Sequence, residues 1–292
     1  MPNPSTTMQP KDRILDVYGV FVRDGHRWLA IADLIALLAE LRVDEQAVRS
    51  AASRMKRQEL LVSSIRDGVS GYELSRRAAE VLIDGDQRIF RAPSSPESPA
   101  WLIAVFSVPE SERKRRYLIR SRLQQLGFGQ TSAGVMIAPA QLRAEAERML
   151  TRADLHKYVS LWCGDYLGFD DLGTVVATAW DLDAIRNGYE TYIATFSEVA
   201  GRCHEHGLDD ATAFVDRMNN LGTWRTLPYV DPGLPAVALP QDWPGDRARA
   251  LFDEIDKALS DGAARHFASV VGSEVEPVGE DVARAARRAK RS

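Results

Sequence analysis

The side chains best suited to binding another molecule are concentrated on one short segment. Residues 43–61 read VDEQAVRSAASRMKRQELL, with four cationic side chains and no acidic one between Val48 and Gln58. Such groups attract DNA phosphates, and arginine binds guanine O6 and N7 bidentately. A helix from Asp44 to about Gln58 would place small apolar residues on one side and polar ones on the other. The predicted DNA-binding residues on this recognition helix are Arg49, Ser50, Ser53, Arg54, Lys56 and Arg57.

A β-hairpin is predicted directly after this helix. The runs LLVSSI and YELS flank the glycine-containing turn RDGVSG, which is the pattern of two strands joined by a short loop. Arg66 lies at the tip, where the wing of a DNA-binding domain makes a second contact with a phosphate or the minor groove. Two alternatives stay open: the basic helix face is only solvated, or Arg66 is paired with Asp67 within the turn.

The cationic residues gather in local clusters, although the chain as a whole is slightly acidic. Its 292 residues include 37 Lys and Arg and 41 Asp and Glu, for a net charge of −4. Residues 11–90 hold 13 basic and 13 acidic side chains. This balance excludes nucleic-acid binding through overall charge and requires a local patch. Between Asp165 and Ile185, five aspartates occur without Lys or Arg, and we interpret this run as a solvated loop that does not face DNA.

A second basic cluster, SERKRRYLIRSR at residues 111–122, holds six cations and the single acid Glu112. Three interpretations compete: a solvated helix face, a contact with the DNA backbone, or a clamp for the phosphates of a ligand. Aromatic residues further along the chain are expected mainly in the core, but a pocket for an aromatic ligand also needs such walls. The candidate ligand-binding residues are Arg115, Arg116, Trp162, Trp180, Arg186, Tyr189, Trp224 and Arg225.

The sequence predicts neither a metal site nor a catalytic site. The segment CHEHGLDD at residues 203–210 gathers possible ligands, but it lacks the paired spacing of zinc sites. We expect His204 and His206 near the C-terminus of a helix that Gly207 ends. The chain has no glycine-rich phosphate loop, GxSxG or HExxH motif, so we expect no cofactor and no enzymatic activity.

The elements that must position these residues predict an α+β protein with three domains. Apolar residues at helical spacing predict two helices ahead of the basic one, which gives an N-terminal winged helix-turn-helix domain over residues 1–90. Residues 91–100, RAPSSPESPA, form a linker rich in Pro and Ser. Strand runs alternating with amphipathic helices predict a central ferredoxin-like α+β domain over 101–178. Residues 179–292 are predicted to be mainly helical, with a basic tail.

The chain shows the features of a soluble cytoplasmic protein. Cys163 and Cys203 are its two cysteines, which favours a reducing compartment over a disulfide scaffold. The N-terminal segment MPNPSTTMQPKDR has no apolar signal core. No segment reaches the ~18 apolar residues that a membrane span requires.

Several longer stretches resemble the PaaX-type transcriptional repressors of phenylacetate catabolism. They are AVRSAASRMKRQELL, WLIAVFSVP leading to RSRLQQLGFGQTSAGVMIAP, and WRTLPYVDPGLPAVALPQDWPGDRARALF. The resemblance covers most of the chain and implies a winged helix-turn-helix, a ferredoxin-like domain related in shape to a CRISPR-associated nuclease, and a helical C-terminal domain. It also implies a homodimer that binds double-stranded operator DNA and is relieved by a small aromatic or acyl-CoA effector, with phenylacetyl-CoA as the type.

The chain departs from this family pattern at Gln58-Glu59-Leu60-Leu61 and at Val135-Met136. These departures leave the expected fold unchanged, but they keep open an acyl-CoA or an aromatic acid other than phenylacetate as the effector. The main alternative is a small-molecule-binding or metal-dependent enzyme whose winged domain makes protein contacts.

Overall fold

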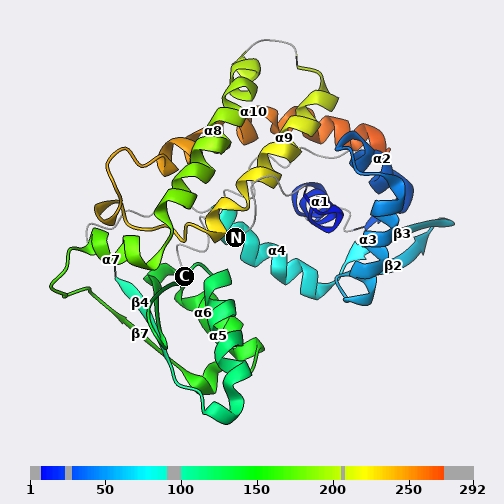
Figure 1. Cartoon of the computed structure of the whole chain (residues 1–292). Coiled ribbons are helices and arrows are strands. Elements are labelled where there is room, and N and C mark those ends of the chain that lie inside the picture. Colours follow the sequence, from blue (N-terminus) through cyan, green and yellow to red (C-terminus); the bar gives the residue numbers. More distant parts are fainter. Residues whose placement is uncertain (1–7, 24–27, 91–99, 205–207, 273–292) are drawn as a thin grey trace, which may run out of the picture. The chain divides into compact units, whose positions relative to one another are not determined.

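Helices and two separate antiparallel sheets make up the computed structural model, which describes residues 8–23, 28–90, 100–204 and 208–272 (Figure 1). The α+β class predicted from the sequence is confirmed. Almost all of the predicted linker, the basic tail, and His206 and Gly207 lie outside the described residues. Within the described ranges, every helix is too short or too polar to cross a membrane.

The elements include those predicted from the sequence and three that were not predicted, β1, β5 and α7. The helices are α1 (Pro10–Val17), α2 (Ile31–Glu40), α3 (Glu45–Arg57), α4 (Arg76–Ile89), α5 (Arg113–Gln125), α6 (Arg143–Arg152), α7 (Leu172–Ala179), α8 (Leu182–His204), α9 (Asp210–Trp224) and α10 (Gly245–Val271). The strands are β1 (Trp28–Ala30), β2 (Leu61–Arg66), β3 (Val69–Leu74), β4 (Trp101–Phe106), β5 (Gly129–Ser132), β6 (Val135–Pro139) and β7 (Val159–Gly164).

The residues group into two compact units that do not follow the order of the chain. The first unit combines the residues up to Gly85 with residues 193–224 and those from Arg249 onward. The second unit comprises residues 86–192 and 225–248. The domain boundaries predicted from the sequence stay a prediction.

The first three helices pack through apolar side chains at helical spacing. In α2, Leu34, Leu37 and Leu38 are fully buried, as their spacing predicts. α1 begins at Pro10, whose fixed φ suits the first helical position. It continues as a wider π-helical turn over Tyr18–Val22. The buried Tyr18 hydroxyl donates to the carbonyl oxygen of Tyr72 in β3 at 2.8 Å, and so links α1 to the sheet.

The first unit contains a three-stranded sheet in the order β1-β3-β2. Asp67 and Gly68 join β2 to β3 and have φ values of 49° and 79°, as a two-residue type I′ hairpin turn requires. β1 was not predicted, because three residues are too few for a periodic pattern. The Trp28 ring of β1 lies 2.5 Å from where a Cβ of Gly71 would be. Gly71 therefore gives the ring the space to cover β3.

Two helices from far along the chain complete the core of the first unit. Phe214 and Met218 of α9 and Phe267 of α10 belong to the same buried cluster as the apolar residues of α1, α2 and α3. Arg13 of α1 donates to the Met218 carbonyl oxygen at 2.8 Å and to Asn219 Oδ1 at 2.6 Å. The helices that follow residue 193 thus share one hydrophobic core with the N-terminal helices.

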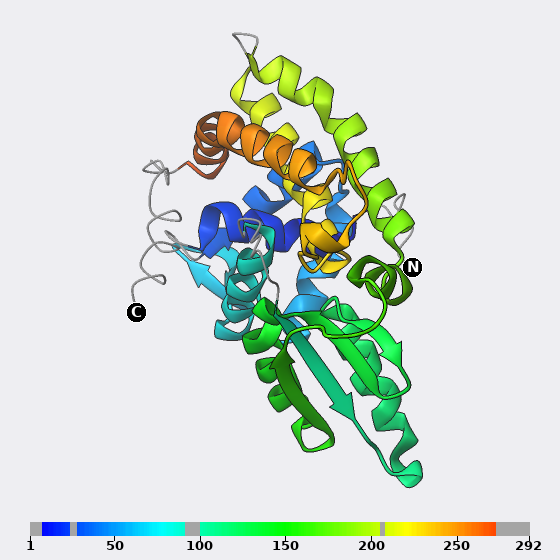
Figure 2. The ribbon, with the colours of Figure 1, turned by 90° about the vertical axis from the view of Figure 1, so that its left-hand side faces the viewer.

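The second unit contains a four-stranded antiparallel sheet in the order β5-β6-β4-β7. Figure 2 shows these strands side by side. Ile119 and Leu123 of α5 and Leu150 of α6 are buried against Leu102 and Ala104 of β4, so that both helices cover one face. The sequence predicted β4, β6 and β7 but missed β5. That strand is short and polar, lacks apolar alternation, and pairs with β6 through an irregular register.

One helix lies within the acidic run between residues 165 and 185. The interpretation of this run as a solvated loop is wrong for residues 172–179, which form α7. The Asp171 side chain caps this helix by accepting from the backbone N–H groups of Gly173 at 2.8 Å and Thr174 at 3.2 Å. Part of the acidic charge is therefore used to begin a helix, as expected for aspartate at an N-cap.

Candidate nucleic-acid interface

α3 is positioned by a cap at its start and by a face of small apolar residues. Asp44 is the N-cap, as predicted, and its Oδ1 accepts from the backbone N–H of Ala47 at 2.9 Å. Val48, Ala51 and Met55 are fully buried, on the side that packs against α1 and α2. Their packing fixes which face of α3 stays outside.

The free face of α3 carries all six residues that the sequence predicted for DNA binding. These residues are exposed: Arg49, Ser50, Ser53, Arg54, Lys56 and Arg57. They form two neighbouring stripes at the i, i+4, i+7 spacing that aligns side chains along a helix. Residues 49, 53 and 56 make one stripe, and residues 50, 54 and 57 make the other.

The cations of α3 differ in what faces them. Arg49 forms an ion pair with Glu45 one turn earlier, with Nε 2.8 Å from Oε1. Within the part of the chain that the structure describes, Arg54, Lys56 and Arg57 have no carboxylate or hydrogen-bond partner. A solvated ion pair contributes little energy, whereas three unpaired cations within about one turn present a net positive surface.

The hairpin places Arg66 next to a different partner from the one considered in the sequence. Arg66 Nη2 lies 2.8 Å from Glu73 Oε1 across the hairpin, and its guanidinium lies over the Trp28 ring at 5.3 Å. Hydrogen bonding from Arg66 lowers the pKa of Glu73. The pair is solvent-exposed, so that breaking it to contact a phosphate costs little.

On α5, the two arginines predicted for ligand binding have partners within the second unit. Arg115 Nε lies 2.5 Å from Glu112 Oε2, and Arg116 donates to the Val108 carbonyl oxygen at 2.9 Å. The cations without a partner in the described residues are their neighbours, which the ligand prediction left out: Arg113, Lys114 and Arg120. The free positive charge of α5 thus lies beside the predicted pair.

Three further residues predicted for ligand binding are also held by the second unit. Trp180 is buried and donates from Nε1 to the Gly127 carbonyl oxygen at 2.9 Å. The Tyr189 hydroxyl donates to Asp231 Oδ2 at 2.9 Å. Arg186 lies over the Trp243 ring at 5.2 Å. Packing and hydrogen bonding within the second unit explain the position of each of these three side chains.

The remaining predicted ligand residues lie in different settings. Trp162 of β7 is 64% exposed. Trp224 is buried in the first unit and stacks on Phe252 with ring centroids 5.0 Å apart. Arg225 is half-buried in the second unit. Trp224 thus belongs to a different unit from the other predicted ligand residues, and the role of all of them in binding stays a prediction.

The described residues hold no cluster of three or more His, Cys, Asp or Glu side chains that could bind a metal ion. His204 ends α8, as the sequence predicted. Its Nε2 lies 2.8 Å from Glu254 Oε1 of α10.

Sequence reasoning also missed a cavity in the first unit that includes Lys11 and Arg77. The signal in the sequence that could have indicated this cavity is the pair Arg76-Arg77, at the start of a helix that has no acidic residue in its first turn.

The fold and this surface define an α+β protein that presents a cationic helix beside an antiparallel hairpin. Three family models match the chain: PaaX-like protein over residues 10–78, PaaX protein central Cas2-like domain over 95–176, and PaaX-like protein C-terminal domain over 180–269. Together they cover most of the chain. The chain belongs to the PaaX family, as its sequence motifs implied.

Two relatives support this assignment. Transcriptional repressor PaaX of Escherichia coli strain K12 is 26% identical over 247 residues, which are 82% of this chain and 77% of that protein. The uncharacterized protein Rv0674 from Mycobacterium tuberculosis has a similar fold, with a TM-score of 0.56, 21% identity, and coverage of 86% of this chain and 96% of that one. Family membership confirms the prediction of a transcriptional regulator and not an enzyme.

Proposed function

We propose that this chain is a dimeric, cytoplasmic repressor that binds double-stranded operator DNA of a phenylacetate-type catabolic operon. In this proposal, a small aromatic or acyl-CoA effector releases it from the operator. The observation that carries the proposal is the exposed face of α3, where three cations have no partner among the described residues. The E. coli relative is named as a transcriptional repressor, which supports repression as the outcome of binding.

The arrangement of α1, α2, α3 and the β2–β3 hairpin supports a winged helix-turn-helix domain. In such a domain one helix enters the major groove and the wing contacts the backbone. The apolar face of α3 is fully buried, so this helix can dock only through its outer face. Arg54 is the residue we assign to a base edge, because arginine binds guanine bidentately. Lys56 and Arg57 are assigned to phosphates.

The second unit supports the predicted ferredoxin-like domain. Its elements follow the order β4, α5, β5, β6, α6, β7, the β-α-β-β-α-β order of that fold. One face of the sheet is covered by α5 and α6. The opposite face exposes Trp162 and Val105, which are 64% and 41% exposed, and Leu167 and Phe169 follow β7 with exposures of 92% and 110%.

We assign this apolar surface to the homodimer interface. Exposed aromatic and aliphatic side chains gathered at one place mark interaction sites. β7 is the last strand of the sheet, and an edge strand has free backbone groups that a second copy of β7 would satisfy. A twofold dimer needs such a self-complementary surface. Two α3 helices in one dimer would contact half-sites about 34 Å apart or a multiple of it.

Release by an effector requires a ligand that prefers one arrangement of the dimer. The ligand would bind more tightly to a geometry in which the two α3 helices no longer match their half-sites, and operator DNA would weaken ligand binding by the same factor. The same coupling free energy then describes how the ligand weakens DNA binding and how DNA weakens ligand binding.

The test of DNA reading is an alanine substitution of Arg54 with a matched control. We expect Arg54→Ala to weaken operator binding by about 1–3 kcal/mol, the value of a bidentate arginine–guanine contact. Arg76→Ala is the control. Arg76 lies on α4 and not on α3, is exposed, and pairs with Glu80 of the same helix at 3.5 Å. Gel-shift titration measures both. Unchanged binding by Arg54→Ala would remove Arg54 from the interface, and equal losses in both variants would mean a general effect of charge.

A further inference from the structure

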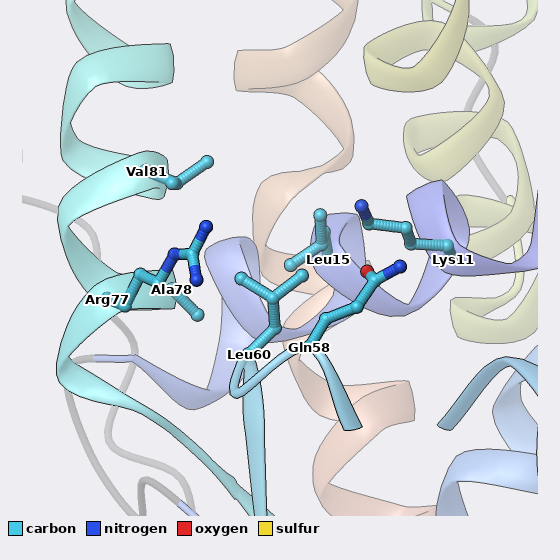
Figure 3. A pocket seen from close by; sticks show the side chains of 7 residues that line it. All are labelled: Lys11, Leu15, Gln58, Leu60, Arg77, Ala78 and Val81. Carbon is cyan, nitrogen blue, oxygen red and sulfur yellow. The ribbon is translucent and has the colours of Figure 1, made fainter. Parts of the chain in front are cut away.

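A cavity of about 360 Å³ opens beside the end of α3 within the first unit. This volume is within the range of small-molecule sites, about 300–1,000 Å³. Its walls come from α1, from the junction between α3 and β2, and from α4 (Figure 3). The lining residues are Lys11, Leu15, Gln58, Leu60, Arg77, Ala78 and Val81.

The walls of this cavity combine apolar surface with two cations. Leu15, Leu60 and Val81 supply the apolar part, and Val81 is 46% exposed although it is an aliphatic residue within a helix. Figure 3 shows Lys11 pointing from α1 and Arg77 pointing from α4 toward the same space. The lining includes no carboxylate, and in the described ranges neither cation has a partner.

The positions of these cations are unfavourable for folding alone. Lys11 and Arg77 are the second residues of α1 and α4. The first turn of a helix carries partial positive charge and favours acidic side chains. α4 has no acid in its first turn, whereas Asp12 in the first turn of α1 does not line the cavity. The two cations and the start of α4 therefore favour an anion beside the apolar surface.

We propose that this cavity binds a small organic carboxylate with an apolar body. Its carboxylate lies between Lys11 and Arg77, because charge-assisted hydrogen bonds to ammonium and guanidinium groups are strong. Its aromatic or aliphatic body contacts Leu15, Leu60 and Val81, whose burial adds hydrophobic free energy. A bare phosphate, including one from DNA, would leave this apolar surface unused.

The cavity touches the elements that carry the DNA-binding surface. Gln58 is the C-cap of α3, and Leu60 immediately precedes β2, with its N–H bonded to the Met55 carbonyl oxygen at 2.9 Å. A ligand that contacts both residues acts on the joint between the helix and the hairpin. Binding in the cavity therefore couples to DNA affinity, a step that rests on the proposed function.

The binding test uses the full chain with phenylacetate and octanoate as probes and inorganic phosphate as the anion without an apolar body. Saturation-transfer NMR detects the probes, and equilibrium dialysis gives their affinities. We expect Arg77→Ala and Lys11→Ala to weaken probe binding at least about tenfold, as loss of a charge-assisted contact does. Arg76→Ala is the matched control, since Arg76 precedes Arg77 on the same helix, is 95% exposed and faces Glu80.

Retained binding in Arg76→Ala with loss in the other two variants supports the site. Three results overturn it: no probe binding at millimolar concentration, equal binding in all variants, or phosphate binding as tight as that of either carboxylate. A smaller salt dependence of DNA binding in Arg77→Ala would also overturn it, since this change marks a DNA phosphate contact.

The coupling step has a separate readout, the operator affinity with and without phenylacetate. A shift in the wild type that Arg77→Ala abolishes supports coupling. Probe binding that leaves operator affinity unchanged supports the site and overturns the coupling. Probe binding by a chain that binds no DNA supports the site and overturns the proposed function.

Discussion

The arginines of this chain differ in which groups face them, and the sequence did not reveal the pairing that forms across the hairpin. The pattern of residues 44–58 predicted which side of α3 is exposed, because helical periodicity fixes it. It did not predict that Arg66 pairs with Glu73, since this contact depends on the register of the hairpin. The ligand prediction selected Arg115 and Arg116 over Arg113 without weighing that Glu112 lies three residues before Arg115, a spacing at which helical side chains pair.

Asp231 is a buried residue whose protonation affects stability. Its Oδ1 accepts from the backbone N–H of Gly233 at 2.9 Å and of Leu234 at 3.0 Å. Burial raises the pKa of Asp231 above its ordinary value, although the hydrogen bonds from Leu234, Tyr189 and Gly233 oppose the shift. At pH values between the unfolded and the folded pKa, this carboxyl is therefore protonated in the folded chain and ionised in the unfolded chain. This carboxyl therefore contributes stability at low pH that is lost as pH rises from about 4 through the folded pKa.

We expect Asp231→Asn to gain stability relative to the wild type as pH rises from 4 to 7.5, because asparagine stays neutral. Denaturant unfolding at both pH values gives the two free-energy differences. Asp171→Asn is the control: hydrogen bonds from Thr174 lower the pKa of Asp171, so its contribution is lost only as pH falls below about 4. An Asp231→Asn difference that is equal at both pH values would contradict the assignment.

At the level of elements, long amphipathic segments were predicted and short or polar ones were not. α2, α3 and α5 have the period that helices require, and the turn at Asp67 and Gly68 has the residues that a type I′ hairpin prefers. β1 and β5 have only three and four residues. They exist because a neighbouring strand supplies backbone partners, which no local pattern records.

The hairpin turn provides a test at this scale. Gly68 has a φ of 79°, and a side chain at this position would meet no steric obstacle, since no heavy atom lies within 4 Å of where its Cβ would be. Gly68→Ala should therefore destabilise the hairpin through backbone strain alone, by about 1 kcal/mol, and weaken operator binding. Gly68→Asn should cost less, because asparagine tolerates positive φ.

Gly201→Ala is the control for this test. Gly201 lies in α8, outside both proposed interfaces, with no heavy atom within 4 Å of its Cβ position and no positive φ. Denaturant unfolding and DNA titration of the three variants give both readouts. Operator binding by Gly68→Ala equal to that of the wild type would exclude the hairpin from the DNA interface.

At the level of the whole molecule, the sequence predicted helices after residue 180 but not the core that they complete. Phe214 and Phe267 are buried with the N-terminal helices, and His266 Nε2 lies 2.8 Å from Glu40 Oε2 of α2. These residues are separated from α1 and α2 by most of the chain, and single-sequence periodicity carries no information on such pairings.

The proposed dimer interface is tested by Trp162→Asp. Placing a charge at an apolar interface and removing an aromatic contact should raise the dimer dissociation constant at least about 30-fold. Ile65→Asp is the matched control, because Ile65 is 71% exposed on the hairpin and lies outside the proposed interface. Sedimentation velocity across a concentration series measures both variants. A Trp162→Asp protein that stays as dimeric as the wild type would rule out this surface.

Operator reading by α3 is best tested by a fluorescence-anisotropy titration of the full chain on its own upstream DNA and on a scrambled sequence, at two salt concentrations. If Lys56 and Arg57 of each protomer neutralise two phosphates, affinity of the dimer should fall about 10²-fold between about 50 and 200 mM salt. At each salt concentration the upstream DNA should bind more tightly than the scrambled one. Equal binding to both sequences, or affinity that does not change with salt, would contradict a repressor that reads its operator through α3.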